Sequence, residues 1–257
     1  MQDLSPVLLR LFSRGAGESL VAAPCSTEAD GNAVAQIHVT LFTAAMYTLY
    51  YYPSNASLAP HMVLEEIGAP YELALVDRNA NEHKGARYLK LNPAGLIPVL
   101  IDGDLVLTEA AAICLHLADR HADAKLAPPL GSNDRAQLYK WLMYLTNTLQ
   151  AELITYYYPD RLGGNTAVEI VQASAEARIG KMLDLIEHHL AYSGGPWMLG
   201  AQYTIVDAYL LMLARWTRGF AHPARARPAL MRFLAAMAGR PAIQRSFNQE
   251  GLQPPWF

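Results

Sequence analysis

The stretch Leu89–Leu100 reads LKLNPAGLIPVL, and the interpretation of the rest of the chain starts from it. A helix is expected to stop at Asn92, and Ile97 opens a strand that carries Pro98 at its second position. Proline has no N–H to give to a sheet, so Pro98 indicates an edge, a bulge or a cis turn. A cis Ile97–Pro98 bond would turn the N–H and C=O of Ile97 outward, where an extended peptide can pair with them, whereas a trans bond is the ordinary form.

The residues that follow this stretch add a second pattern. Asp102-Gly103 predicts a tight hairpin turn, and the run Leu107–Ile113, LTEAAAI, predicts the start of a helix. The order L-x-x-N-P-x-G-x-I-P-x-L, turn and helix start resembles the glutathione-binding half of cytosolic glutathione S-transferases. The similarity is to bacterial members, nearest to the beta and theta-like classes.

The resemblance implies specific contacts with glutathione, the co-substrate of that family. Pro98 is expected to be cis, and Ile97 to pair through its backbone with the cysteinyl part of glutathione. Glu109, at the start of the next helix, is expected to hold the amino group of the γ-glutamyl end. The serine that normally follows this acidic residue is Ala110 here, which leaves the backbone N–H groups of the helix start for the γ-glutamyl carboxylate.

Strands and helices alternate in the first part of the chain. The predicted elements are strand Tyr47–Tyr52, helix Leu58–Gly68 with Ser57 as its N-cap, strands Tyr71–Val76, Ile97–Asp102 and Leu105–Leu107, and helix Thr108–His121 with Thr108 as its N-cap. A strand, a crossover helix and a strand favour a parallel pair, and the next two strands form a hairpin. This βαβ-ββα order resembles the thioredoxin fold and predicts an α/β N-terminal domain over residues 46–127.

The run Ala127–Ser132, APPLGS, breaks the pattern and marks the domain boundary. The chain beyond it is predicted to be helical, over Asn133–Tyr157, Thr166–Tyr192, Thr204–Phe220, Arg227–Gly239 and Pro241–Phe247. We therefore expect residues 132–257 to form an all-α C-terminal domain, as the resemblance implies. Thr204 and Asp207 form an S/T-x-x-D capping box, so Asp207 is expected to be buried by its cap bonds. No His or Cys stands at ligand spacing from it, so no metal site is predicted.

A transferase of this family must favour the thiolate of glutathione, because the thiolate is the nucleophile. A side chain at the N-terminus of the first helix can donate a hydrogen bond to that sulfur, and the helix dipole adds to the effect. The resemblance to the theta and zeta classes gives this role to Ser54, with Asn55 and Ser57 as alternatives. The beta-class cysteine falls on Ala56, so beta-class chemistry is absent. The competing interpretation is that these residues only form the turn and cap the helix.

Other positions also depart from the beta-class pattern. The His-Lys pair of that class falls on Gln150 and its successor. The lysine of the loop after the second strand has no clean match, and Lys84 or His83 is expected to substitute for it in holding glutathione. Tyr51 and Tyr52, at the end of the first strand, are further candidates for activating the thiol.

The second substrate is expected to lie between the domains, against apolar side chains of the first long helix after the boundary. These are Tyr144, Leu149, Tyr156, Tyr157 and Tyr158, whose helical spacing also suits a core. The sequence thus predicts an enzyme that adds the glutathione thiolate to an apolar electrophile. The alternatives are another glutathione-dependent reaction, such as isomerisation, peroxide reduction or ether cleavage, and a non-catalytic binding protein. The last is favoured by the losses at Ala56, Ala110 and Gln150.

Composition narrows the class of protein and its partners. The 257 residues are 52% hydrophobic, with a net charge of −3 and no basic run, which argues against a nucleic-acid partner. No apolar run reaches the roughly 18 residues of a membrane helix. Cys25 and Cys114 cannot make a disulfide scaffold, which favours the cytoplasm.

Residues 1–45, before Met46, are expected to be a disordered extension, with a targeting or partner-binding tail as the alternative. The resemblance implies a homodimer.

Overall fold

Strand β1 (Tyr47–Tyr51) is an inner strand of a four-stranded sheet in the computed structural model, which describes residues 46–257. Its side chains alternate between two faces. Tyr47 and Leu49 are buried against helices, whereas Tyr50 points to the other face and meets Tyr88 edge-on, with ring centroids 6.0 Å apart. The disordered extension predicted for residues 1–45 lies outside the described residues.

Helix α1 (Leu58–Ile67) connects β1 to the parallel strand β2 (Tyr71–Leu75), with Tyr47 opposite Tyr71 in the register. Gly68 ends α1 in the left-handed conformation, at φ 66°, which glycine adopts without steric cost. The predicted strand, crossover helix and parallel strand are thereby confirmed.

Strand β3 (Val99–Asp102) pairs antiparallel with β1 and with β4 (Leu105–Thr108), which gives the sheet order β2-β1-β3-β4. The Ile97–Pro98 bond is cis, as the resemblance implied. The prediction that the strand starts at Ile97 was wrong by two residues, because the ladder begins only at Val99. A mixed sheet in this order, with helices on its faces, is the thioredoxin-like arrangement that the sequence predicted.

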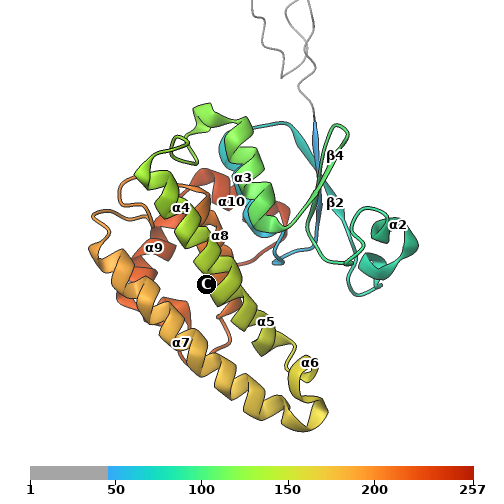
Figure 1. The fold of residues 1–257 in the computed structure, drawn as a ribbon, viewed down its shortest axis with the longest axis vertical. Coiled ribbons are helices and arrows are strands. Elements are labelled where there is room, and N and C mark those ends of the chain that lie inside the picture. Colours follow the sequence, from blue (N-terminus) through green and yellow to red (C-terminus); the bar gives the residue numbers. More distant parts are fainter. Residues whose placement is uncertain (1–45) are drawn as a thin grey trace, which may run out of the picture. The chain divides into compact units, whose positions relative to one another are not determined.

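Helix α3 (Ala110–Arg120) packs beside α1, and the short helix α2 (Ala86–Leu89) lies away from both, across the sheet (Figure 1). Tyr88 of α2 packs in a small cluster with Val76, Ile97 and Val99. The prediction of Thr108 as the cap of α3 was wrong. Thr108 still pairs with Val99 as the last residue of β4, so Glu109 takes the N-cap position instead.

The chain after residue 132 is helical, as predicted. Its helices are α4 (Asn133–Tyr144), α5 (Ala151–Tyr157), α6 (Asp160–Gly163), α7 (Val168–Tyr192), α8 (Ile205–Trp216), α9 (Pro228–Ala238) and α10 (Pro241–Gln249). A π-helical segment, Leu145–Gln150, joins α4 to α5. Single turns of 3₁₀ helix occur at Glu82–Lys84, Ala122–Ala124, Asn165–Ala167 and Ala224–Ala226. Among residues 46–257, no helix has the length and apolar run that crossing a bilayer requires.

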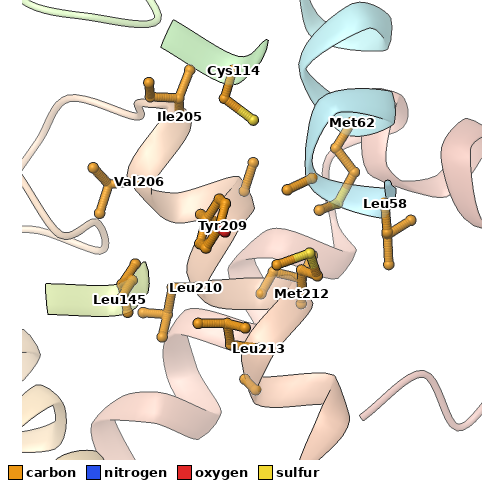
Figure 2. Close-up of a cluster of buried hydrophobic side chains, with 14 of the residues drawn as sticks. Leu58, Met62, Cys114, Leu145, Ile205, Val206, Tyr209, Leu210, Met212 and Leu213 are labelled. Carbon is orange, nitrogen blue, oxygen red and sulfur yellow. The ribbon is translucent and has the colours of Figure 1, made fainter. Parts of the chain in front are cut away.

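Helix α8 is buried all round, from Ile205 to Arg215, which is typical of a helix at the centre of a core. Figure 2 shows Tyr209 and Met212 of α8 on the side of Leu58 and Met62 of α1, with Cys114 of α3 nearby. Buried residues of the sheet, of α1 and α3, and of the helices after residue 132 belong to one continuous hydrophobic cluster. The thioredoxin-like part and the helical part therefore share a core.

Asp207, in the first turn of α8, is buried by its capping bonds, as the sequence predicted. Its side chain is fully enclosed, and its carboxylate accepts from the backbone N–H groups of Met198 at 2.8 Å and of Thr204 at 2.7 Å. The Thr204 hydroxyl completes the capping box. The carboxylate thus satisfies two N–H groups that would otherwise be buried without a partner.

Replacement of Asp207 by alanine is expected to lower the free energy of unfolding by about 3 kcal/mol, because two buried N–H groups lose their acceptor. Urea denaturation followed by circular dichroism measures the change. Asp134→Ala serves as the control, since Asp134 is an exposed carboxylate in the first turn of α4. Equal losses in the two variants would contradict the assignment.

The difference in unfolding free energy between the wild type and Asp207→Ala should also depend on pH. Burial raises the pKa of the Asp207 carboxyl to about 7, against the opposing effect of its cap bonds. A raised pKa means that the folded chain holds the proton more tightly than the unfolded chain, in which the pKa is about 3.9. The advantage of the wild type over Asp207→Ala should therefore be largest near pH 4 and decline as the pH rises to 7.

Candidate functional site

A cleft of about 570 Å³ lies where the thioredoxin-like part meets the helical part. Residues from both parts line it. The thioredoxin-like part contributes Ser54, Asn55, Ala56, Arg78, His83, Lys84, Asn92, Gly95, Leu96, Ile97, Pro98, Glu109 and Ala110, and the helical part contributes Gln150, Ile154, Tyr157, Tyr158, Arg161, Tyr209, Trp216 and Arg218. Most residues predicted to hold glutathione or activate its thiol are brought together here. The exceptions are Ser57, Tyr51 and Tyr52, which do not line the cleft.

Ser54 lies in the loop between β1 and α1, in the left-handed region at φ 59°. Few non-glycine residues adopt this conformation, so contacts must hold it in place. Its N–H donates to the Glu250 carboxylate at 2.8 Å, and its C=O accepts from the Trp216 indole at 3.2 Å. Its hydroxyl makes no hydrogen bond with any described residue, so it remains available to a ligand in the cleft.

The two alternatives to Ser54 differ in their surroundings. Asn55 lines the cleft, and its Oδ1 accepts from the Ala56 N–H at 2.7 Å, which leaves its amide NH₂ as a donor. Ser57 is fully buried, and its hydroxyl donates to the Tyr52 carbonyl at 3.2 Å. Ser57 occupies the N-cap position of α1, yet no side-chain cap bond forms because the hydroxyl turns back to Tyr52.

Ile97 presents an unused backbone edge to the cleft. The residue lies between α2 and β3, and neither its N–H nor its C=O bonds to any of the described residues. The preceding carbonyl, that of Leu96, accepts from the Tyr88 hydroxyl and the Asn92 amide, each at 2.8 Å, which fixes the segment. A free donor and acceptor on one residue can receive a peptide as an added strand would.

Glu109 and Ala110 form the start of α3 at the cleft wall. Glu109 is exposed and has a positive φ of 67°, as Ser54 and Gly95 of the cleft also do. Its carboxylate makes no hydrogen bond within the described part of the chain. Ala110 is buried and opens the helix. The pair therefore offers a carboxylate for a cation and free helix-start N–H groups for an anion.

Lys84 and His83 line the cleft and lie close to Gly95. The Lys84 amine donates to the carbonyls of Ala94 at 3.3 Å and Gly95 at 3.0 Å. Burial, together with the nearby Lys84 and Arg78 charges, lowers the pKa of His83. Its Nδ1 is buried and finds no partner among residues 46–257, so a ligand that reached it would satisfy an open hydrogen-bonding group.

The aromatic wall is only partly where the sequence predicted it. Tyr157 and Tyr158 line the cleft, but Leu149 is fully buried in the core. Tyr144 and Tyr156 also pack against the core and do not line the cleft. Sequence reasoning missed other lining residues of the helical part, namely Ile154, Tyr209, Trp216 and Arg218, because no local motif marks them. Gln150 accepts from the Tyr209 hydroxyl at 2.5 Å.

Two family models match the sequence. The one described as "Glutathione S-transferase, N-terminal domain" covers residues 45–119, and the one described as "Glutathione S-transferase, C-terminal domain" covers residues 137–249. Glutathione S-transferase GstA of Escherichia coli O157:H7 is 31% identical over 207 residues, which span 80% of this chain and 99% of that protein. The chain belongs to the glutathione S-transferase family.

Other relatives and solved structures of this family agree. Glutathione S-transferase GST-4.5 of Xanthomonas campestris is 32% identical, over 79% of this chain and 98% of that protein. A glutathione transferase homologue from Sulfitobacter, solved with bound glutathione, has a TM-score of 0.75 at 26% identity and covers 81% of this chain and 100% of its own. BphK, a bacterial glutathione S-transferase solved as a ternary complex, has a TM-score of 0.71 at 31% identity, over 80% of this chain and 100% of its own. These matches confirm the predicted family and fold.

Glu250 holds the loop that carries Ser54, and its contacts can be tested by mutation. Its side chain is completely buried, accepts from Ser54 and lies 2.9 Å from His61 Nδ1. Glu250→Ala is expected to lower the free energy of unfolding by about 2–4 kcal/mol, because the buried His61 ring and the partly buried Ser54 N–H lose their partner. Urea denaturation measures it, with Gln253→Ala, an exposed position nearby, as the control. A loss no larger than that of the control would show that Glu250 does not hold the loop.

Proposed function

We propose that this chain binds glutathione in the cleft and adds its thiolate to a small electrophile with an apolar body. The sulfur attacks an electrophilic carbon and forms an S–C bond, the leaving group departs with its bonding electron pair, and the thiol proton passes to solvent. The observation that carries the proposal is the unused backbone edge of Ile97, which lies in the same cleft as the free Ser54 hydroxyl.

The placement of glutathione follows from the groups that have no partner. The amino group of the γ-glutamyl end pairs with the Glu109 carboxylate, and its carboxylate takes the N–H groups at Ala110. The cysteinyl backbone pairs with Ile97, next to Pro98. The glycyl carboxylate lies toward Lys84 and His83, where Lys84 supplies positive charge. Each assignment joins a charge or hydrogen-bonding group of the tripeptide to a complementary group on the cleft wall.

Thiol activation is assigned to Ser54, with Asn55 as the second donor within the cleft. A hydroxyl that donates to the sulfur favours the thiolate, and the positive end of α1 acts in the same direction. Ser57 is the weakest of the three candidates, since its hydroxyl is committed to Tyr52 and lies outside the cleft.

Replacement of Ser54 by alanine should move the pH–rate profile of conjugation to higher pH. A lost hydrogen bond to a charged sulfur removes about 1–3 kcal/mol of thiolate stabilisation, which raises the thiol pKa by about 1–2 units. Retention on immobilised glutathione should stay nearly unchanged, because the backbone contacts remain. Asn55→Ala and Ser57→Ala are the matched comparisons. If one of these moved the profile while Ser54→Ala kept that of the wild type, the assignment would be wrong.

The same two measurements separate the related functions. Retention on immobilised glutathione together with turnover of an aryl chloride supports conjugation. Retention without any turnover would favour a binding protein, and activity only toward a peroxide, an isomerisable substrate or an aryl ether would favour the corresponding glutathione-dependent reaction. Among the described residues, the losses at Ala56, Ala110 and Gln150 favour the binding protein, and none favours one of the other reactions over conjugation.

We also propose a homodimer in the cytoplasm, with domains at residues 46–127 and 132–257. Homodimers with a two-fold axis are the commonest soluble homo-oligomers. Exposed apolar side chains on β4 and α4 offer surface for a second copy; these are Leu105, Val106, Tyr139 and Met143. The buried free thiol of Cys114 suits a reducing compartment.

Light scattering at micromolar concentration tests the assembly. The expected mass is twice the 28.3 kDa of one chain. A Val106→Glu variant should shift the mass toward the monomer if β4 lies in the interface, since a buried unpaired charge opposes association. A wild-type mass of one chain would overturn the proposed dimer.

A further inference from the structure

The cleft carries the opposite charge to the rest of the protein. Arg78, Lys84, Arg161 and Arg218 line it, and Glu109 is the only carboxylate among the described residues that line it, although the whole chain has a net charge of −3. Walls of low dielectric that carry one sign of charge raise the local concentration of ligands of the other sign. Positive charge is contributed by both parts of the chain. Arg78 and Lys84 belong to the thioredoxin-like part, and Arg161 and Arg218 belong to the helical part.

Arg161 and Arg218 belong to the helical part and are free of carboxylate partners among the described residues. Five other arginines of the helical part each pair with a carboxylate, namely Arg135, Arg178, Arg227, Arg240 and Arg245. Within residues 46–257, the Arg161 side chain makes no hydrogen bond and the Arg218 side chain donates only to the Arg215 carbonyl, at 2.6 Å. Their guanidinium groups therefore keep most of their donors for a ligand.

Both guanidinium groups are placed against the aromatic wall. Arg161 lies over the Tyr158 ring, 4.0 Å from its centroid. Arg218 is close enough to Tyr157 to oppose the rise in the pKa of that phenol that burial causes. The hydroxyl of Tyr157 donates to the Trp216 carbonyl. An aromatic compound resting on this wall would thus have a cation beside each of two adjacent tyrosines.

These two cations are not needed for the glutathione contacts proposed above. Those contacts use Glu109, the helix start at Ala110, the Ile97 backbone and the Lys84 amine, all from the thioredoxin-like part. Arg78 donates to the Tyr158 hydroxyl at 2.8 Å and lies near His83, so it stands between the two sets.

We propose, on the basis of the proposed function, that the second substrate is an aromatic electrophile that carries a carboxylate or another anionic group, held by Arg161 and Arg218. The aromatic ring stacks on Tyr157, Tyr158 and Trp216, and the anion points to the guanidinium groups. Arginine suits this role because its planar fork binds a carboxylate through two hydrogen bonds.

A matched pair of electrophiles tests the proposal, 4-chloro-3,5-dinitrobenzoate and its neutral carboxamide. In both, the glutathione sulfur bonds to the ring carbon that carries chlorine, and chloride leaves with the electron pair. Each kcat/KM is divided by the rate constant of the uncatalysed reaction with glutathione, which corrects for ring activation. The corrected value should be about tenfold higher for the benzoate, as expected of a charge-assisted contact. Added NaCl should reduce the preference.

Variants locate the effect. Arg161→Gln and Arg218→Gln should each lower the benzoate preference by about threefold to fivefold, the range expected for exposed charge pairs. The KM for glutathione should stay at the wild-type value. Arg232→Gln is the control, since Arg232 is exposed on α9 and does not line the cleft. Equal corrected rates for the two electrophiles, or a preference that survives the double variant, would overturn the proposal.

Binding of the two reaction products separates this proposal from the proposed function. Calorimetry measures the affinities of the glutathione conjugates that end in a carboxylate and in a carboxamide. Tighter binding of the carboxylate conjugate, lost in the double Arg161→Gln, Arg218→Gln variant, supports the anion site even if neither chloride turns over. Equal affinities would reject the anion site, whereas absent turnover alone would reject only the transferase function.

Discussion

The buried carboxylate of Glu250 is the contact on which the rest of the site depends. An isolated carboxylate inside a protein is costly, and Glu250 is tolerated because Ser54 donates to one oxygen and His61 approaches the other. Ser54 lies 196 residues from Glu250 in the chain. The loop that we propose to face the glutathione thiol is therefore set by the end of the last helix, and the Trp216 indole fixes the same residue from another direction.

The order of the elements could be predicted from the sequence because periodicity, glycine and proline act locally. The alternation in Tyr47–Tyr51 and the capping box at Thr204 and Asp207 are patterns of neighbouring residues. The starts of α3 and β3 were predicted wrongly because they depend on backbone conformations that side-chain patterns do not encode. Glu109 adopts a positive φ and shifts the start of α3, and the ladder of β3 begins two residues after Ile97.

The same distinction applies to the site. The side of the cleft formed by Ile97, Pro98, Glu109 and Ala110 was predictable because these residues belong to one recurring motif. The other wall is assembled by packing of α5, α6 and α8, whose residues carry no shared signature. The π-helical segment Leu145–Gln150 also changes the phase of the helix before Tyr156, since each of its turns holds more residues than an α-helical turn. Spacing of 3.6 residues therefore could not tell Tyr156, in the core, from Tyr157, in the cleft.

The core shared by α1, α3 and α8 limits how this chain can exchange parts with its relatives. If the thioredoxin-like half of another family member were joined to this helical half, the buried side chains of the two halves would not be complementary in shape. Leu58 and Met62 would have to be matched to Tyr209 and Met212, since close-packed interiors tolerate volume changes poorly. Recombination at the boundary between the two halves, residues 127–132, should preserve folding only where the donor half carries side chains that pack against α8 as Leu58 and Met62 do.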